Sequence, residues 1–188
     1  SVTSRFATRL QALAGARSPL CIGIDPSTEL LQGWGLPVSA AGVGRFCALV
    51  MEAAGDRVAL VKPQAAFFER FGPEGMRELR SVVATIRAQG ALSLIDCKRN
   101  DIGHTLAAYG EAMLGEDSPF GGDAITASAY LGFASLAPIV AVARREQAMV
   151  FVVVRSSNPE GADLQHAALR DGRTVAERLA DDIAAENA

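Results

Sequence analysis

Ionisable residues stand at the ends of three short apolar segments of the sequence. Asp25, Lys62 and Asp96 each end such a segment. Lys98 comes two residues after Asp96. An array of alternating carboxylates and ammonium groups can keep a lysine protonated while the carboxylates orient it. Such a lysine suits the stabilisation and protonation of a carbanion, a general-acid reaction that needs no metal.

The residues that follow Asp96 extend this array. Side chains alternate between the two faces of a strand, so Asp96 and Lys98 are predicted to point the same way and Cys97 the other way if the extended backbone continues. Asp101 comes next, at the start of a predicted helix, and Thr105 lies one turn further on the same helical face. Any one of these Asp or Lys residues, taken alone, is better interpreted as a solvated loop charge than as part of a site. The shared position of these residues at strand ends favours a site.

Other polar residues are weaker candidates. His104 and His166 are far apart in the sequence, and His104 is predicted to decorate a helix rather than bind a metal. The motif Ser156-Ser157-Asn158-Pro159 follows the last apolar segment, where a plain turn and a ligand contact are equally good interpretations.

Short apolar segments alternate with amphipathic helical patterns along the chain. Predicted strands cover 20–25, 58–63, 91–96, 124–127 and 148–154, and predicted helices cover 3–15, 39–54, 73–90, 101–114, 133–145 and 174–187, with loops at 26–38 and 156–172. This alternation indicates parallel β-α units with both faces of the sheet covered. A flavodoxin-like sheet and an incomplete (β/α)8 barrel both fit it. Neither a G-x-G-x-x-G nor a P-loop motif is present, which weakens nucleotide-binding interpretations.

Composition limits the class of protein further. The chain has 188 residues, 49% hydrophobic and 21% charged, which favours one globular domain. Its net charge of −3 gives no reason to expect a nucleic acid or an anionic membrane as partner. The sequence shows no apolar run of membrane-spanning length and no signal-peptide pattern. The three cysteines lack C-x-x-C spacing, which predicts reduced thiols in a cytoplasmic protein rather than a disulfide framework or a zinc site.

The sequence resembles the orotidine 5′-phosphate decarboxylase family, in the branch with longer loops found in mycobacteria and related bacteria. The main motif is Asp96-Cys97-Lys98-Arg99-Asn100-Asp101-Ile102, which matches the family signature Asp-x-Lys-x-x-Asp-Ile. The flanking motifs that match in order are Gly23-Ile24-Asp25-Pro26, Val61-Lys62-Pro63-Gln64, Phe67-Phe68-Glu69, Tyr130-Leu131-Gly132 and Ser156-Ser157-Asn158-Pro159.

This resemblance implies a fold and an activity. The fold is an α/β, (β/α)8 TIM barrel of the ribulose-phosphate-binding type. The implied reaction is the decarboxylation of orotidine 5′-phosphate to UMP in pyrimidine biosynthesis, without cofactor or metal. The implied assembly is a homodimer in which Asp101 and Thr105 reach into the partner subunit's site.

The resemblance also implies roles for individual residues. Lys98 is expected to donate the proton to C6 after CO2 leaves, and Asp96 to lie beside the substrate carboxylate. Lys62 is expected to bridge Asp96 and the ribose. Asp25 is expected to hold a ribose hydroxyl and Ser157 to contact the pyrimidine.

The number of predicted strands differs from that of a whole barrel. A (β/α)8 barrel usually needs about 250 residues, and about five β-α units are visible here. We therefore expect a single domain over residues 1–188 that is truncated at its C-terminal end. Two alternatives stay open: a Mg²⁺-dependent sugar-phosphate decarboxylase or synthase of the same superfamily, and a non-catalytic α/β binding module. The resemblance places a metal-binding carboxylate at the end of strand two in the Mg²⁺ enzymes, where this sequence has Lys62.

Overall fold

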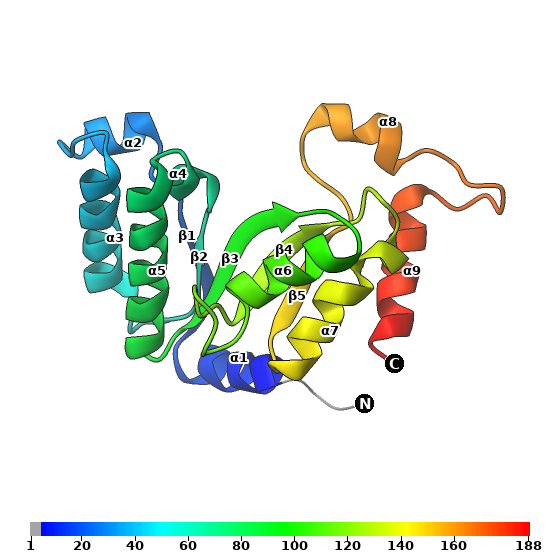
Figure 1. Cartoon of the computed structure of the whole chain (residues 1–188), viewed down its shortest axis with the longest axis horizontal. Helices are drawn as coiled ribbons and strands as arrows, with labels where there is room; N and C mark the ends of the chain where they lie inside the picture. The colour runs from blue at the N-terminus through cyan, green and yellow to red at the C-terminus, as the bar shows by residue number, and fades with distance from the viewer. Residues whose placement is uncertain (1–4) are drawn as a thin grey trace.

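The computed structural model describes residues 5–188 and contains a five-stranded sheet (Figure 1). The strands are β1 (Ser18–Ile24), β2 (Val58–Pro63), β3 (Leu92–Arg99), β4 (Ala124–Ser128) and β5 (Met149–Val153). They lie in the order β1-β2-β3-β4-β5, and each neighbouring pair is parallel. The predicted parallel β-α units are therefore present.

Helices connect the strands. They are α1 (Arg5–Ala16), α2 (Thr28–Gly33), α3 (Ala40–Ala54), α4 (Ala66–Glu69), α5 (Gly72–Ala88), α6 (Gly103–Met113), α7 (Ala137–Arg145), α8 (Ala162–Gln165) and α9 (Val175–Glu186), with 3₁₀ turns η1 (Phe133–Leu136) and η2 (Pro159–Gly161). Within the described part of the chain, no helix is both long and apolar enough to cross a bilayer.

The strand order distinguishes the two predicted architectures. Each new strand is added beside the previous one without a reversal, whereas a flavodoxin-like sheet reverses its order at a switch point. Right-handed crossovers that always advance in one direction keep their helices on one face of the sheet. Helix α3 accordingly packs against α5, and α6 packs against α7, on that face (Figure 1). The winding is that of a barrel, with the crossover helices on one face of the sheet and α1 over part of the other.

Alternate strand residues enter two separate apolar clusters. Val61, Ile95 and Ile125 belong to the larger cluster, which they form with the helices on the outer face. The smaller cluster lies on the opposite, inner face, where Leu60, Leu92, Leu94 and Ala124 meet Phe6 of α1. Helix α1 contacts β1, β2 and β3, so it covers the inner face near the N-terminal ends of these strands.

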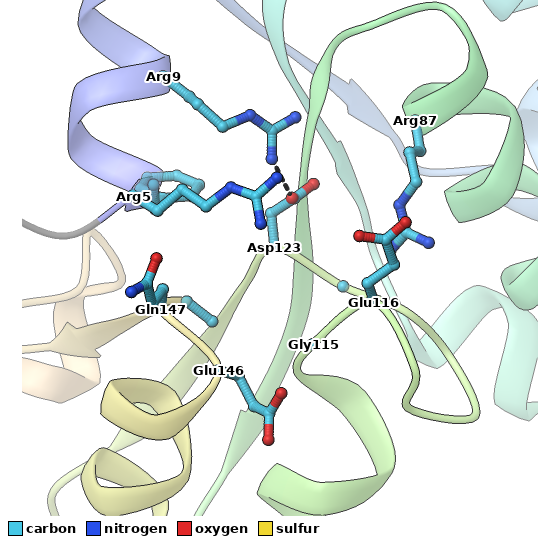
Figure 2. A pocket seen from close by; sticks show the side chains of 11 residues that line it. Arg5, Arg9, Arg87, Gly115, Glu116, Asp123, Glu146 and Gln147 are labelled. Carbon is cyan, nitrogen blue, oxygen red and sulfur yellow. Dashed lines mark hydrogen bonds and ion pairs between the residues drawn. The ribbon is translucent and has the colours of Figure 1, made fainter.

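The partly buried carboxylate of Asp123 links α1 to the sheet (Figure 2). Arg9 donates to Asp123 Oδ1 at 2.9 Å, and the main-chain N–H and hydroxyl of Ser93 donate to Asp123 Oδ2 at 2.9 and 3.1 Å. The Asp123 N–H in turn donates to Ser93 Oγ at 3.0 Å. Ser93 is 1% exposed, so its polar groups depend on Asp123 for partners.

We expect Asp123→Ala to lower the free energy of unfolding by about 2–4 kcal/mol, because it leaves buried donors of Ser93 without an acceptor. Arg9→Ala removes a partly exposed ion pair with the same carboxylate and is expected to cost less than about 1 kcal/mol. Urea unfolding of the two variants measures the difference. Equal small losses would show that the Ser93 bonds contribute nothing.

Side-chain caps begin the helices α2, α3 and α9. The Ser39 Oγ accepts the Gly42 N–H at 3.2 Å and caps α3. Thr174 and Glu177 form a capping box at the start of α9. The predicted loop 26–38 was wrong in part, because Ser27 caps the short helix α2 by accepting the Leu30 N–H. The predicted loop 156–172 likewise contains η2 and α8.

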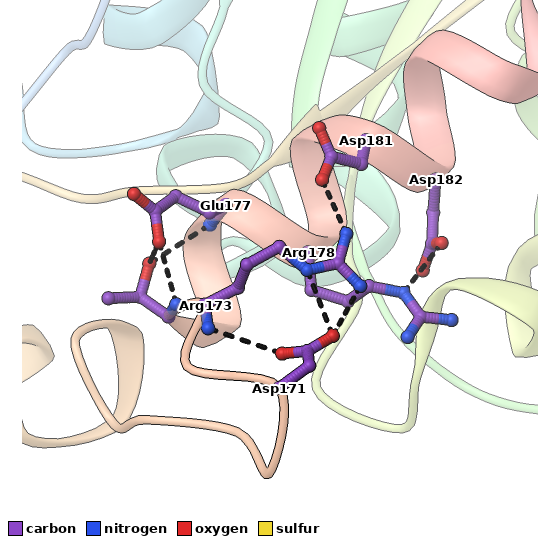
Figure 3. A network of polar contacts seen from close by, with 7 residues as sticks. Asp171, Arg173, Glu177, Arg178, Asp181 and Asp182 are labelled. Carbon is purple, nitrogen blue, oxygen red and sulfur yellow. Dashed lines mark hydrogen bonds and ion pairs between the residues drawn. The ribbon is translucent and has the colours of Figure 1, made fainter.

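Ion pairs hold the segment that leads into α9 (Figure 3). Arg173 pairs with Asp171 in the loop and with Asp181 on the helix, the latter at 2.6 Å. Arg178 pairs with Asp182 one turn further along α9 at 2.8 Å. All these groups lie at the surface, so the network orders the loop more than it stabilises the fold.

Candidate active site

Asp96 lies at the carboxyl end of β3 and is the centre of a polar cluster. Its Oδ1 accepts hydrogen bonds from Lys98 Nζ at 2.7 Å and Thr126 Oγ1 at 2.8 Å. Its Oδ2 accepts from Lys62 Nζ at 3.1 Å and Gln64 Nε2 at 3.2 Å. The Asp96 side chain is 8% exposed. Four donors thus satisfy one buried carboxylate, and two of them are the only lysines in the chain.

The donors decide the charge of this carboxylate. Burial alone would raise the pKa of Asp96, because it disfavours the ionised form. Hydrogen bonds from Lys98, Thr126 and Lys62 outweigh burial and lower the pKa below its usual value. Asp96 is therefore ionised near neutral pH and fixes a negative charge between two ammonium groups.

The cluster extends to β1 through Asp25. Its Oδ1 lies 4.0 Å from Lys62 Nζ, which completes the series Asp25, Lys62, Asp96 and Lys98 across the carboxyl ends of β1, β2 and β3. Lys98 is 53% and Asp25 51% exposed, so the two ends of the series are open to a ligand. The structure therefore brings together four of the seven residues that the sequence nominated.

The backbone at Lys98 departs from an extended strand. Residues 95 and 99 of β3 pair with residues 125 and 127 of β4, so residues 96–98 lie opposite Thr126 alone. Lys98 has a φ of 43°, in the left-handed region. The ammonium still meets Asp96, but the strand does not continue regularly as predicted.

Cys97 points away from the polar cluster, toward the outer apolar cluster. Its Sγ lies 3.6 Å from the main-chain oxygen of Thr126. Burial raises the pKa of the Cys97 thiol, and the nearby Arg99 only partly offsets this. A partly buried, protonated thiol is a poor nucleophile, so the geometry favours a packing role for Cys97.

A cavity of about 350 Å³ opens beside the cluster and is lined by Gln64, Phe67, Asp96 and Lys98, among others. A second cavity, of about 230 Å³, lies at the opposite end of the strands between α1 and the segments that enter β4 and β5 (Figure 2). Parallel barrels place their active sites at the carboxyl ends of the strands. The cavity beside Asp96 is therefore the candidate active site.

The remaining three predicted residues lie apart from this cluster. Within residues 5–188, no hydrogen bond or ion pair joins Asp101, Thr105 or Ser157 to it. Asp101 Oδ1 accepts the Ile102 N–H at 2.8 Å at the start of α6. Thr105 is exposed on the first turn of α6, and Ser157 is exposed in the loop after β5. Their roles stay predictions.

The sequence analysis missed the two neutral donors to Asp96. Gln64 was part of a quoted motif without a role, and Thr126 was not considered. Gln64 follows Lys62 by two residues, so the alternation that nominated Lys98 beside Asp96 also applied to it. Thr126 carried no comparable signal, because its place opposite Asp96 depends on the register between β3 and β4.

Loops around the cluster are joined by arginines. Arg99 forms an ion pair with Glu69 of α4, and its guanidinium lies 5.1 Å from the Tyr109 ring centre on α6. Arg70 donates to Thr28 Oγ1 at 3.0 Å and to the Pro26 carbonyl at 3.1 Å. These contacts join the segments after β1, β2 and β3, which carry the charged residues.

Comparisons with known proteins agree with this geometry. The profile of the Orotidine 5′-phosphate decarboxylase / HUMPS family matches residues 18–187. The chain is 52% identical over 182 residues to the orotidine 5′-phosphate decarboxylase of Myxococcus xanthus, covering 97% of this chain and 63% of that protein. It is 50% identical over 183 residues to the protein of the same name in Streptomyces coelicolor, covering 97% and 66%.

Solved structures of other proteins also resemble the fold of this chain. The crystal structure of a Streptomyces avermitilis protein superimposes with a TM-score of 0.95 at 51% identity, covering 98% of this chain and 65% of that one. The OMP decarboxylase of Leishmania donovani gives a TM-score of 0.77 at 35% identity, covering 94% and 63%. This chain spans about two thirds of the length of these relatives. A family profile that matches almost the whole chain, together with the barrel winding and the Asp/Lys cluster, shows that the chain belongs to the orotidine 5′-phosphate decarboxylase / HUMPS family.

Proposed function

We propose that the protein containing this chain decarboxylates orotidine 5′-phosphate to UMP, the last step of UMP synthesis. The observation that carries this proposal is the ionised Asp96 held between Lys62 and Lys98 at the open ends of the strands. Relatives whose sequences are about 50% identical to this chain bear the name of this enzyme.

The cluster suits the chemistry at C6 of the pyrimidine. The bond from C6 to the carboxylate breaks, CO2 leaves, and the electron pair stays on C6. The Lys98 ammonium donates its proton to that carbon, which gives UMP and a neutral amine that solvent reprotonates. Asp96 orients the ammonium, and its fixed negative charge lies next to the position of the departing carboxylate. Because the charges are held in place before reaction, little reorganisation accompanies the step.

Substrate binding is assigned to the other charged and polar residues. Lys62 contacts both Asp96 and Asp25, and so suits a bridge between the reacting centre and the ribose. Asp25 is open to a ribose hydroxyl. Ser157 lies on the loop after β5 and is proposed to contact the pyrimidine when substrate is bound.

We further propose a homodimer that completes each site. Asp101 and Thr105 are proposed to enter the partner subunit's site. Large exposed apolar side chains support this assembly, since Ile102 after β3, and Tyr130 and Leu131 after the neighbouring β4, are 62%, 71% and 51% exposed. Exposed apolar groups gathered in one place are typical of protein interfaces. We place the protein in the cytoplasm, where the free thiols would stay reduced.

The proposal is tested by incubating the purified protein with orotidine 5′-phosphate and measuring CO2 release and UMP formation. Titration with UMP in metal-free buffer gives an independent measure of binding. A protein that binds UMP and releases CO2 supports the proposal. No turnover, with no binding of UMP by a folded protein, would refute it and favour a non-catalytic module.

Metal dependence separates this proposal from the alternative of a Mg²⁺-dependent sugar-phosphate enzyme of the same superfamily. Within residues 5–188, no three His, Cys, Asp or Glu side chains are grouped as metal ligands. Two ammonium groups lie among the carboxylates of the cluster and would repel a divalent cation. We expect decarboxylation to keep its full rate after EDTA treatment and dialysis. Loss of activity that Mg²⁺ restores would instead indicate the sugar-phosphate reaction class.

A further inference from the structure

The β-bulge beside Asp96 leaves one main-chain donor without a strand partner. Residues 96–98 of β3 lie opposite Thr126 of β4, so the regular ladder cannot continue at Lys98. The Lys98 N–H donates instead to the side-chain oxygen of Thr126 at 2.9 Å. The hydroxyl of Thr126 thus replaces the carbonyl that a regular strand would offer.

The same hydroxyl also binds the reacting cluster. Thr126 Oγ1 donates to Asp96 Oδ1 at 2.8 Å, and Lys98 Nζ donates to that same oxygen at 2.7 Å. A hydroxyl has one hydrogen, so this hydrogen goes to the carboxylate and an oxygen lone pair accepts the Lys98 N–H. Thr126 therefore binds the main chain of Lys98 and Asp96 binds its ammonium, and a hydrogen bond joins Thr126 to Asp96.

Lys98 needs such support because its backbone is strained. Its φ of 43° lies in the left-handed region, which residues with a Cβ rarely adopt because of steric crowding. Such a conformation persists where the surroundings impose it. The N–H that donates to Thr126 belongs to Lys98, the residue with the unusual φ. The conformation of Lys98 in turn sets the direction in which its side chain leaves the strand.

We propose that Thr126 is a positioning residue for the decarboxylation. Its hydroxyl holds the left-handed backbone of Lys98 and one oxygen of Asp96 together, and so aims the ammonium at the reacting carbon. The proposal rests on the proposed function, in which Lys98 is the proton donor. In this proposal Thr126 acts through the two charged residues that it binds, and it transfers no proton to the substrate.

Two substitutions at this position separate the hydroxyl from the shape of the side chain. Thr126→Val keeps a β-branched side chain suited to a strand but removes both hydrogen bonds. Thr126→Ser keeps the hydroxyl. We expect Thr126→Val to lower kcat about 10- to 100-fold with KM within about threefold, and Thr126→Ser to keep kcat within about threefold of the wild type.

A second measurement follows the position of Lys98 through the rate at which its amine is acylated, and needs no catalytic turnover. The protein is treated briefly with an amine-acylating reagent at fixed pH, and the labelling of each lysine is measured by mass spectrometry of its peptides. We expect Lys98 to be labelled several-fold faster in Thr126→Val than in the wild type or Thr126→Ser. Lys62 does not bind Thr126, and its unchanged labelling is the internal reference. Thr85→Val, which removes a hydroxyl bonded within α5, is the control substitution.

The outcomes distinguish this proposal from the proposed function. Wild-type kcat and wild-type Lys98 labelling in Thr126→Val would overturn it. So would a fall in kcat and in the thermal midpoint with an unchanged labelling ratio of Lys98 to Lys62, since that pattern marks a purely structural role. If the wild type does not decarboxylate the substrate, the proposed function fails, and the labelling ratio alone decides whether Thr126 positions Lys98.

Discussion

Lys98→Ala is expected to abolish decarboxylation, with a rate at least about 10³-fold below the wild type. The substitution removes the proton donor, which is also one of the two ammonium groups bound to Asp96. The fold is expected to survive. Lys98 is 53% exposed, and Asp96 keeps three other donors, Thr126, Lys62 and Gln64. A direct CO2-release assay measures the loss, and thermal unfolding and UMP titration check that the variant is folded.

A matched control separates this effect from the loss of any surface cation. Arg57 is 79% exposed and pairs with Asp56 at 3.9 Å, outside the Asp96 cluster. Arg57→Ala is expected to decarboxylate at the wild-type rate. Substantial CO2 release by a folded Lys98→Ala protein would contradict the assignment of Lys98 as the proton donor. Another group would then have to donate the proton.

The charged part of the site was predictable because it follows from local rules. Parallel strands bring their carboxyl ends to one edge of the sheet, and side chains two residues apart share a face. These rules suffice to place Asp25, Lys62 and Asp96 together, whereas Lys98 joins them although its backbone leaves the extended conformation. The strand segments were predictable for a similar reason, since each is a short apolar run between helical patterns.

The strand order and the bulge could not be predicted in this way, because both depend on contacts between segments far apart in the sequence. Alternating strands and helices fit two architectures, and only the pairing of neighbouring strands separates them. The φ of Lys98 and the role of Thr126 depend on a register shift between β3 and β4. A local pattern carries no information about that register.

Asp101 presents a different case, because its position within one chain does not explain a role in catalysis. Its carboxylate accepts the Ile102 N–H and forms no hydrogen bond or ion pair with the Asp96 cluster in the described chain. The residue lies beside exposed apolar side chains that suit an interface. A site completed by the partner subunit reconciles these observations with the proposed role.

This shared site predicts that two inactive proteins restore activity when mixed. In a heterodimer of Lys98→Ala and Asp101→Ala subunits, one site carries both substitutions and the other carries neither. Random exchange of equal amounts makes about half of the dimers mixed, so about a quarter of all sites are intact and the rate is expected to reach about a quarter of the wild type. The CO2-release assay after mixing and subunit exchange measures it.

The control is a mixture in which the same subunit carries both substitutions. Wild-type and doubly substituted subunits form heterodimers whose two sites each lack one residue, so these dimers are expected to be inactive. Exchange is followed separately by native mass spectrometry, because the substituted subunits differ in mass. If exchange occurs and the single variants stay inactive when mixed, then Asp101 serves the same subunit as Lys98, and the site is built within one chain.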